Sequence, residues 1–432
     1  MRSPRPWRRD MVVGPPYCDV AAMRRLNPKG VFLLFPSLFP AGGNKWSAGD
    51  LGGMNVSYGT GLWYWRPSHV WTDGGCDKLP GPVNLGCMRQ FNFDWDQLYN
   101  ADGSQAFISG KTGPRGWNLA DPTGKGTREL VAKFLAYTSK VSGLYTKGWD
   151  GVFSDNWIYG ILGEDWAYGP NLDTDRDGKV DDYAVLRRRW DDGLNEVGNR
   201  IRSYLPGKIV VGNGNWFPMK HKYHGSDPQG WLKASNGTMI ESIEDYYDRS
   251  SDLLKIASRW LDFRDPAGQP RYMLFFQNAL TGTGKRLEVP SAVDPNTTKY
   301  MLDQSVMRSA RWGLTLALMA GAYYEIYLNY NHSTRWWYDE YDGGKGVRSR
   351  GYLGQPLGRA VELRPGVWRR DFKHGIALNN STSKSATIDL KARYKHLRGS
   401  QNPRLNNGKA VNEVTLPGHD GVILLRVKQK PR

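Results

Sequence analysis

The feature that most constrains the fold of this chain is a repeated alternation of short apolar segments with amphipathic helical ones. Each apolar segment ends in a polar or glycine-rich loop, and a helical pattern follows. Strands that alternate with helices form parallel β/α units. The expected strands cover residues 11–14, 31–36, 151–154, 208–212, 237–240, 272–276 and 322–327. Seven buried strands with no early glycine-rich phosphate loop favour a (β/α)8 TIM-type barrel over an open doubly wound sheet.

The expected helices cover residues 126–144, 183–205, 250–261 and 301–319. In the second of them, apolar residues recur at spacings of three and four, which places them on one helix face. A barrel of this type closes only with an eighth strand. We expect the first strand to be missing from this chain, or to be replaced by irregular structure in a long insertion at residues 38–116. Within that insertion, Ala101-Asp102-Gly103 is typical of a hairpin turn.

The chain changes character after Arg350, where the helical periodicity disappears. Short alternating segments follow at residues 367–372, 375–378, 386–390, 412–416 and 421–427, and turn signals separate them. This pattern is typical of a small antiparallel β-sandwich. We therefore predict two domains, a barrel over residues 1–349 and a β-sandwich over residues 350–432. The second domain is expected to rest on the barrel through the apolar residues of 352–357.

The formal net charge of +17 is concentrated towards the C-terminus. Residues 1–340 contain 40 Lys and Arg against 36 Asp and Glu, whereas residues 341–432 contain 19 against 6, a net charge of +13. Two interpretations stay open. An anionic polymer binds the C-terminal domain, or the charge only keeps the protein soluble.

Composition excludes several classes of protein. Hydrophobic residues make up 39% and charged residues 23% of the chain, which excludes general disorder. No apolar run approaches the ~18 residues that a membrane-spanning helix needs. The 51 Gly, 18 Trp and 23 Tyr suit either a protein that stacks on sugar rings or simply a large aromatic core.

The cysteines and the N-terminus bear on localisation. Cys76 and Cys87 flank a Gly/Pro-rich loop, and a disulfide between them would imply an oxidising, extracellular compartment; Cys18 has no visible partner. No Cys or His spacing fits zinc. The segment MRSPRPWRRD is basic but lacks an apolar core, so it is not a signal peptide. The protein is then cytoplasmic, or it is secreted after removal of its signal.

Polar residues stop the apolar segments, and in parallel barrels the catalytic groups lie at the carboxyl ends of the strands. Amides and carboxylates that share one rim, with aromatic rings beside them, suit carbohydrate recognition. The expected substrate-binding residues are Asn156, Trp157, Asn213, Asn215, Trp216, Glu244, Gln277, Asn278 and Glu325.

Asp155 and Glu241 are the best candidates for a catalytic carboxylate pair. Two β/α units separate their strands, about a quarter of a turn around an eight-stranded ring. Carboxyl groups so placed can face each other across the barrel mouth. The alternative is structural: Asp155 caps its loop, and Glu241 pairs with a cation. Glu244 is a weaker candidate if Glu241 points into the barrel.

The segment from Asp173 to Asp182 predicts a calcium site. Oxygen-bearing residues alternate and a glycine follows, as in the first half of an EF-hand loop. The twelfth position holds Ala184 instead of the usual Glu, so Asp181 or Asp182 would have to substitute. An aspartate-rich turn without an ion is the alternative. The expected ligands are Asp173, Asp175, Asp177, Lys179, Asp181 and Asp182.

The segment Gly148-Trp149-Asp150-Gly151-Val152-Phe153-Ser154-Asp155-Asn156 is similar to a YDGVFLDN strand of known barrels. With the segments at 211–214, 239–241, 352–356, 369–372, 375–380 and 421–425, it resembles a family of TIM-barrel glycoside hydrolases, the hypothetical glycosyl hydrolase family 15. The resemblance implies that Asp155 and Glu241 are the catalytic carboxylates and that a small β-domain follows the barrel. It supplies a reaction class and no substrate.

These observations predict a glycoside hydrolase that cleaves an oligo- or polysaccharide, with no organic cofactor. Asp155 would be the nucleophile or stabiliser, and Glu241 the general acid/base. Two alternatives remain. One is a non-catalytic carbohydrate-binding protein on a degenerate barrel, and the other is a polyanion-binding protein that works through its basic C-terminal domain.

Overall fold

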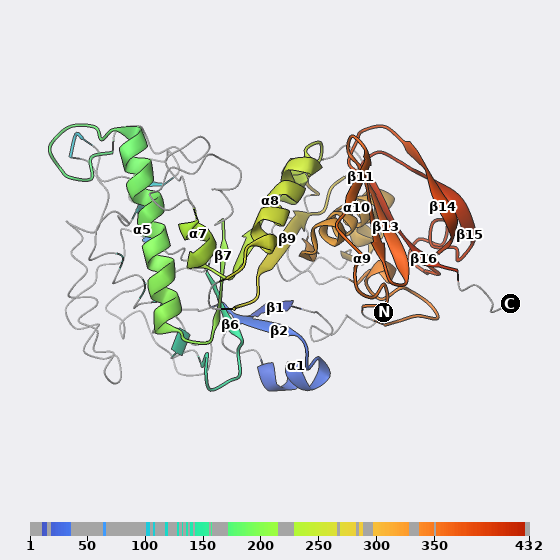
Figure 1. Cartoon of the computed structure of the whole chain (residues 1–432), viewed down its shortest axis with the longest axis horizontal. Helices are drawn as coiled ribbons and strands as arrows, with labels where there is room; N and C mark the ends of the chain where they lie inside the picture. Colours follow the sequence, from blue (N-terminus) through green and yellow to red (C-terminus); the bar gives the residue numbers. More distant parts are fainter. Residues whose placement is uncertain are drawn as a thin grey trace. The chain divides into compact units, whose positions relative to one another are not determined.

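The computed structural model in Figure 1 describes part of the chain. The described residues are 11–14, 19–35, 64–65, 101–103, 107–108, 117–119, 128, 132, 135–136, 139–140, 143–154, 157, 172–214, 229–265, 268–281, 285–287, 297–327, 337–349 and 351–427. The chain divides into two compact units. The N-terminal unit comprises Trp7–Met239 and Phe263–Tyr272, and the C-terminal unit comprises Met1–Pro6, Ile240–Asp262 and Met273–Arg432.

Seven parallel strands follow one another in the sheet in the order in which they occur in the chain. They are β1 (Met11–Gly14), β2 (Val31–Leu34), β6 (Gly151–Ser154), β7 (Ile209–Asn213), β8 (Gly237–Ile240), β9 (Tyr272–Asn278) and β10 (Tyr323–Tyr327). Consecutive order is typical of a β/α barrel, because the strand order of a doubly wound sheet reverses. All seven expected strands are confirmed. No eighth parallel strand is among the described residues, so the complete (β/α)8 barrel stays a prediction.

The strands at the centre of the N-terminal unit are buried along most of their length. Every residue of β6 is buried, as are four of the five residues of β7, as expected for parallel strands covered on both faces. A Cβ on Gly151 would lie 2.1 Å from the carbonyl oxygen of Ile209 in β7. Asp150, just before β6, accepts hydrogen bonds from the guanidinium of Arg24 at 2.8 and 2.9 Å and from the N–H of Phe32 at 2.7 Å. This carboxylate is therefore a structural group at the amino end of the sheet.

The described helices are α1 (Val20–Leu26), α5 (Tyr183–Tyr204), α7 (Gly230–Ala234), α8 (Ser250–Asp262), α9 (Thr297–Met301) and α10 (Gln304–Ala320), with the 3-10 turns η2 (Ile243–Tyr246) and η3 (Asp339–Tyr341). The helix predicted over 301–319 is divided, because the Asp303 side chain accepts the N–H of Ser305 and caps α10. Residues 128, 132, 135–136 and 139–140 of the predicted helix 126–144 are helical. No helix among the described residues has both the length and the apolar character needed to cross a membrane.

Part of the predicted insertion forms a small antiparallel sheet. Its strands are ordered β3 (Tyr64–Trp65), β5 (Trp117–Leu119) and β4 (Phe107–Ile108). Residues 101–103 form the expected turn, with Gly103 at φ 79°. The segment before that turn lies outside the described residues.

The C-terminal strands form one six-stranded antiparallel sheet in the order β11, β12, β13, β16, β14, β15. They are β11 (Val361–Arg364), β12 (Val367–Phe372), β13 (Gly375–Asn380), β14 (Ala386–His396), β15 (Ala410–Leu416) and β16 (Asp420–Arg426). Alternate residues of these strands, among them Ile376, Leu390 and Leu424, form a buried core. The described strands belong to a single sheet, so the two packed layers of a sandwich stay a prediction.

The second face of β13 and β16 packs against helix α10 in the same unit. Ala377 and Ile423 share a buried cluster with Met319 of α10. We expected residues 352–357 to make the contact with the barrel. Leu353 does join this cluster, but Leu357 is 63% exposed. Strands β13 and β16 provide most of the docking surface because their alternate residues are apolar on both faces.

Candidate active site

Glu241 directly follows β8, the position predicted for a catalytic carboxylate. The next residue, Ser242, has a left-handed backbone with φ 61°, which turns the chain sharply into η2. The N–H of Asp245 then bonds to the Ser242 carbonyl at 3.0 Å, and the N–H of Tyr247 bonds to the Glu244 carbonyl at 3.1 Å. This compact turn places Glu241 and Glu244 on one short, fixed segment.

The Glu241 carboxylate is half-buried and accepts a hydrogen bond from the hydroxyl of Tyr327 at 3.3 Å. Tyr327 is the last residue of β10. Its burial raises the pKa of the phenol, and the charges of Glu241 and Glu244 raise it further. Tyr327 is therefore a permanent hydrogen-bond donor that orients the Glu241 carboxylate.

Glu244, in η2, is held by Asn278 at the end of β9. Its Oε1 accepts the side-chain amide of Asn278 at 2.6 Å, and its Oε2 accepts the backbone N–H of Asn278 at 3.2 Å. The Nε of Arg286 lies 3.1 Å from Oε1. Burial raises the pKa of Glu244, while the bonds from Asn278 and the charge of Arg286 oppose that rise. Both oxygens of this carboxylate already have hydrogen-bond partners. Glu244 is therefore better suited to hold the turn in place than to transfer a proton.

The register of β9 and β10 brings the two partners of these carboxylates together. Asn278 pairs with Tyr327 at the ends of the two parallel strands. Glu244 and Glu241 are bound by these neighbouring residues, so both acids lie at the carboxyl ends of the strands. That is the rim on which β/α barrels carry their catalytic groups.

Two residues expected to bind substrate are core residues instead. Gln277 is fully buried, and its amide donates to the Ser309 hydroxyl at 2.7 Å and accepts from the Tyr324 hydroxyl at 2.8 Å. Trp157 is also fully buried, and a Cβ on Gly212 would lie 2.8 Å from its ring. The Gln277 side chain faces α10, and the Trp157 ring fills space against β7. Neither side chain is presented to a ligand.

The other expected residues fall into three groups. Glu244 and Asn278 are buried and bonded to each other. Asn213 and Glu325 are half-buried, at the end of β7 and within β10. Asp155, Asn156, Asn215 and Trp216 lie outside the described residues, as do Cys18, Cys76 and Cys87. The role of Asp155 therefore stays a prediction from the sequence.

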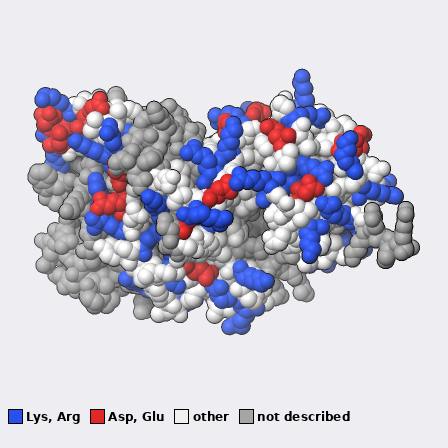
Figure 2. Space-filling view, in the orientation of Figure 1, with Lys and Arg blue, Asp and Glu red and all other residues white. Residues whose placement is uncertain are grey.

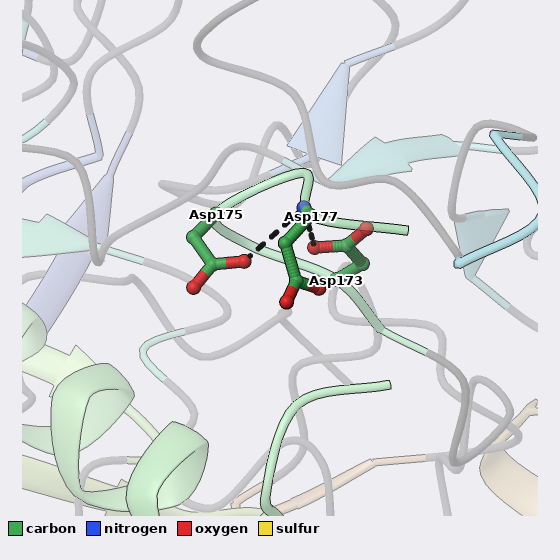
Figure 3. Close-up of side chains that lie close together, drawn as sticks. All are labelled: Asp173, Asp175 and Asp177. Carbon is green, nitrogen blue, oxygen red and sulfur yellow. Dashed lines mark hydrogen bonds between the residues drawn. The ribbon is translucent and has the colours of Figure 1, made fainter. Parts of the chain in front are cut away.

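The aspartate-rich loop before α5 brings three of its predicted calcium ligands together. One carboxylate oxygen from each of Asp173, Asp175 and Asp177 lies within 4.8 Å of the others, and Asp173 is buried (Figure 3). The N–H of Asp177 bonds to Asp173 at 3.2 Å and to Asp175 at 3.3 Å. Three hard carboxylate oxygens gathered on one turn fit the donor preference of Ca²⁺.

The remaining predicted ligands have other partners. Asp182 caps α5, because its Oδ1 accepts the N–H of Val185 at 2.9 Å. Asp181 accepts the N–H and hydroxyl of Thr174 at 2.7 and 2.6 Å, which closes the loop. The Lys179 ammonium lies 3.3 Å from Asp177, so only its backbone carbonyl suits a cation. The cap gives Asp182 a structural role through one oxygen, and its part as a calcium ligand stays a prediction.

Sequence reasoning missed Tyr327 and Arg286. Tyr327 is the last residue of a predicted strand, so its place at the rim could have been inferred. Arg286 lies in a loop without periodicity, and its N–H pairing with Glu244 depends on a turn that no local pattern indicates.

Comparison with known proteins places the chain among glycoside hydrolase-like proteins. The model of the family described as hypothetical glycosyl hydrolase family 15 matches residues 136–376, more than half of the chain. No curated protein matches the chain.

Several solved structures are similar at low identity. A cycloalternan-degrading enzyme from Trueperella pyogenes in complex with isomaltose is 12% identical with a TM-score of 0.40, over 95% of this chain and 52% of that one. An α-amylase from Anoxybacillus is 11% identical with a TM-score of 0.41, over 95% and 79%. A dextranase from Flavobacterium johnsoniae is 10% identical with a TM-score of 0.40, over 79% and 41%. The chain thus spans about half the length of the first of these structures. On the family match, this chain belongs to hypothetical glycosyl hydrolase family 15.

Proposed function

We propose that the chain is a glycoside hydrolase that cleaves an O-glycosidic bond of an oligo- or polysaccharide. Glu241 acts as general acid/base, and Asp155 acts as nucleophile or charge stabiliser. The observation that carries the proposal is the half-buried Glu241 carboxylate at the end of β8, oriented by the Tyr327 hydroxyl in a chain of this family. A pair of carboxylates is the usual machinery of glycoside hydrolysis.

The surrounding residues define how Glu241 would work. Tyr327 donates a hydrogen bond to Glu241 and fixes the carboxyl orientation. The Glu244 negative charge, itself paired with Arg286, contributes to the electrostatic field felt by this hydroxyl. Asn278 anchors Glu244, so the turn that carries both acids is fixed before substrate binds.

The test separates the two roles by the leaving group. A general acid is needed less when the leaving group is already a good one, whereas a nucleophile is needed for every substrate. Glu241→Gln should therefore lose on the order of 10²–10⁴-fold in kcat on unactivated glycosides and much less on dinitrophenyl glycosides. Asp155→Asn should lose activity on both.

The matched control is Asp252→Asn, which removes an exposed carboxylate from the first turn of α8. It should retain wild-type turnover on the same panel of aryl glycosides and polysaccharides. Wild-type activity in Glu241→Gln would reject the acid/base assignment. Binding of sugars by a wild-type protein that turns over none of the panel would favour a non-catalytic carbohydrate-binding protein.

We also propose that Asp173, Asp175 and Asp177 hold a structural Ca²⁺, with the Lys179 carbonyl as a further oxygen ligand. The ion would order the loop that leads into α5 and would take no part in proton transfer. The support is the gathering of three carboxylate oxygens within 4.8 Å on a turn that has the alternating spacing of a calcium loop.

A further inference from the structure

Two loops of the C-terminal unit carry a group of exposed cations that the proposed reaction does not use. The loops cover residues 342–349 and 398–409. They are joined by a bridge between Gly344 and Arg398 and by a bond from the Lys345 N–H to the Arg398 carbonyl at 2.7 Å. The exposed cations, named here the two-loop basic surface, are Lys345, Arg348, Arg398, Arg404 and Lys409.

The acidic residues near this surface accept hydrogen bonds from N–H groups of the two loops. Asp339 accepts the backbone N–H groups of Ser400 and Gln401 at 2.7 and 3.0 Å. Asp342 accepts the N–H of Gly344 at 3.0 Å, and the buried Glu340 accepts the Asn406 amide at 2.8 Å. Within the described residues, none of the five cations forms an ion pair with a carboxylate. Their charge therefore faces solvent.

The backbone of the two loops is fixed by close packing. A Cβ on Gly344 would lie 2.5 Å from the Arg398 carbonyl oxygen, and Gly344 has φ 72°. Only glycine fits both restraints without strain. The cations are therefore displayed from a preformed backbone, which lowers the entropy lost when a ligand binds.

An aromatic pair adjoins the same loops. The half-buried rings of Trp337 and Tyr341 meet edge to face at 5.4 Å. The Trp337 indole N–H lies 3.3 Å from Asp342, and the Gln401 amide donates to the Trp337 carbonyl at 2.7 Å. Flat apolar rings next to unpaired cations match a polymer with ring faces and acidic groups.

We propose that the two-loop basic surface binds an anionic polysaccharide. Its carboxylate or sulfate groups would pair with the cations, and a sugar ring would pack beside Trp337. Figure 2 shows Lys and Arg spread over the visible face of the C-terminal sheet, with patches of Asp and Glu among them. The choice of a polysaccharide over other polyanions rests on the proposed glycoside hydrolase function. The attraction itself rests on the unpaired cations.

The test measures binding of the full chain to polygalacturonate, neutral dextran and duplex DNA at low and at high NaCl. Lys345→Glu/Arg404→Glu/Lys409→Glu should weaken polygalacturonate binding about tenfold or more, since three exposed attractions become repulsions. Binding of the wild type should also weaken with salt, because exposed charges are screened over about 8–10 Å. Dextran should not bind at this surface.

The matched control is Lys373→Glu/Lys384→Glu/Arg393→Glu, which makes the same charge change at exposed positions elsewhere, in two turns between the C-terminal strands and in β14. It should retain most of the affinity. Equal losses of polygalacturonate affinity in the two triple variants would overturn the proposal. The polymer would then be attracted by the net charge of the whole domain and not by the two-loop basic surface. DNA binding at least as tight as polygalacturonate binding would also overturn it, in favour of a nucleic-acid partner. The binding measurement does not require turnover. It can therefore succeed even if the proposed glycoside hydrolysis is not observed.

Discussion

Gln277 illustrates how a single residue type at a strand end can be misjudged. Its position in β9 suggested a ligand-binding amide, yet the amide lies against α10, where Gly313 leaves room for it. A Cβ on Gly313 would approach the Gln277 Oε1 to 1.9 Å. Asn278, one residue later, points to the opposite face and binds Glu244 at the rim. Alternation along the strand therefore separates a core amide from a site amide.

At the same scale, Glu244→Gln is expected to change how stability depends on pH. Burial raises the pKa of the Glu244 carboxyl above its ordinary value of 4.5. The folded state then binds this proton more tightly than the unfolded state. The resulting stability is fully present below 4.5 and is lost as pH rises through the folded value. The free energy of unfolding of wild type minus that of the variant should therefore fall as pH rises from below 4.5 to neutral.

Urea unfolding at a series of pH values checks this expectation. Glu413→Gln, which removes an exposed carboxylate from β15, controls for the loss of one charge. A difference that stays constant or grows with pH would show that the hydrogen bonds from Asn278 and the charge of Arg286 outweigh burial.

At the scale of elements, the strands could be predicted and several loops could not. Each of the seven strands is an apolar segment that can be recognised from its own few residues. Val152 and Val211, for example, are fully buried. The helix predicted over 301–319 is divided by the Asp303 cap, and Asp182 caps α5. Side-chain caps of this kind interrupt a helix without changing its apolar spacing, so the spacing alone does not reveal them. The turn at Ser242, which brings Glu244 to Asn278, depends on a left-handed residue without a glycine signal.

The loop before α5 is predicted to bind calcium through Asp175, whereas Asp182 is expected only to cap the helix. Calcium should raise the Tm of the wild type and a chelator should lower it, because an ion that binds only the folded state stabilises it. Asp175→Ala, which removes the side-chain oxygen altogether, should abolish the response. Asp182→Asn should keep it, because Asp182 caps α5 and asparagine caps equally well.

Thermal unfolding with added calcium, with magnesium and with chelator provides the measurement. A wild-type Tm that ignores calcium and chelator alike would identify the loop as an aspartate-rich turn. Loss of the response in Asp182→Asn would instead return Asp182 to the ligand set.

At the scale of the whole molecule, the basic C-terminal segment is less separable than its composition suggests. Helix α10 supplies Arg311 and Trp312 to contacts with the C-terminal sheet, where the Trp312 N–H donates to the Ser381 hydroxyl at 2.8 Å. His419 lies 2.8 Å from Asp248 and stacks on Tyr247, three residues after Glu244. The sheet thus holds the segment that follows the acidic turn, and a cut near residue 350 would uncover apolar and charged groups of α10.

The buried pair of Arg311 and Asp420 tests this coupling. Their bonds of 2.9 and 2.8 Å lie among buried residues. Asp420→Asn should therefore leave a buried guanidinium without its hydrogen-bonded counter-charge, with the charge of Glu340 still acting on it, and cost about 3–5 kcal/mol of unfolding free energy. Arg311→Met/Asp420→Leu removes both charges and should be more stable than the single variant. Asp389→Asn, in the exposed pair with Lys391, should change the free energy of unfolding little.

Urea unfolding followed by tryptophan fluorescence and by circular dichroism should give coincident transitions if α10 and the sheet unfold together. Wild-type stability in a chain truncated after residue 349 would show that the C-terminal sheet is an independent module. Wild-type stability in Asp420→Asn would show that this buried pair does not provide the coupling.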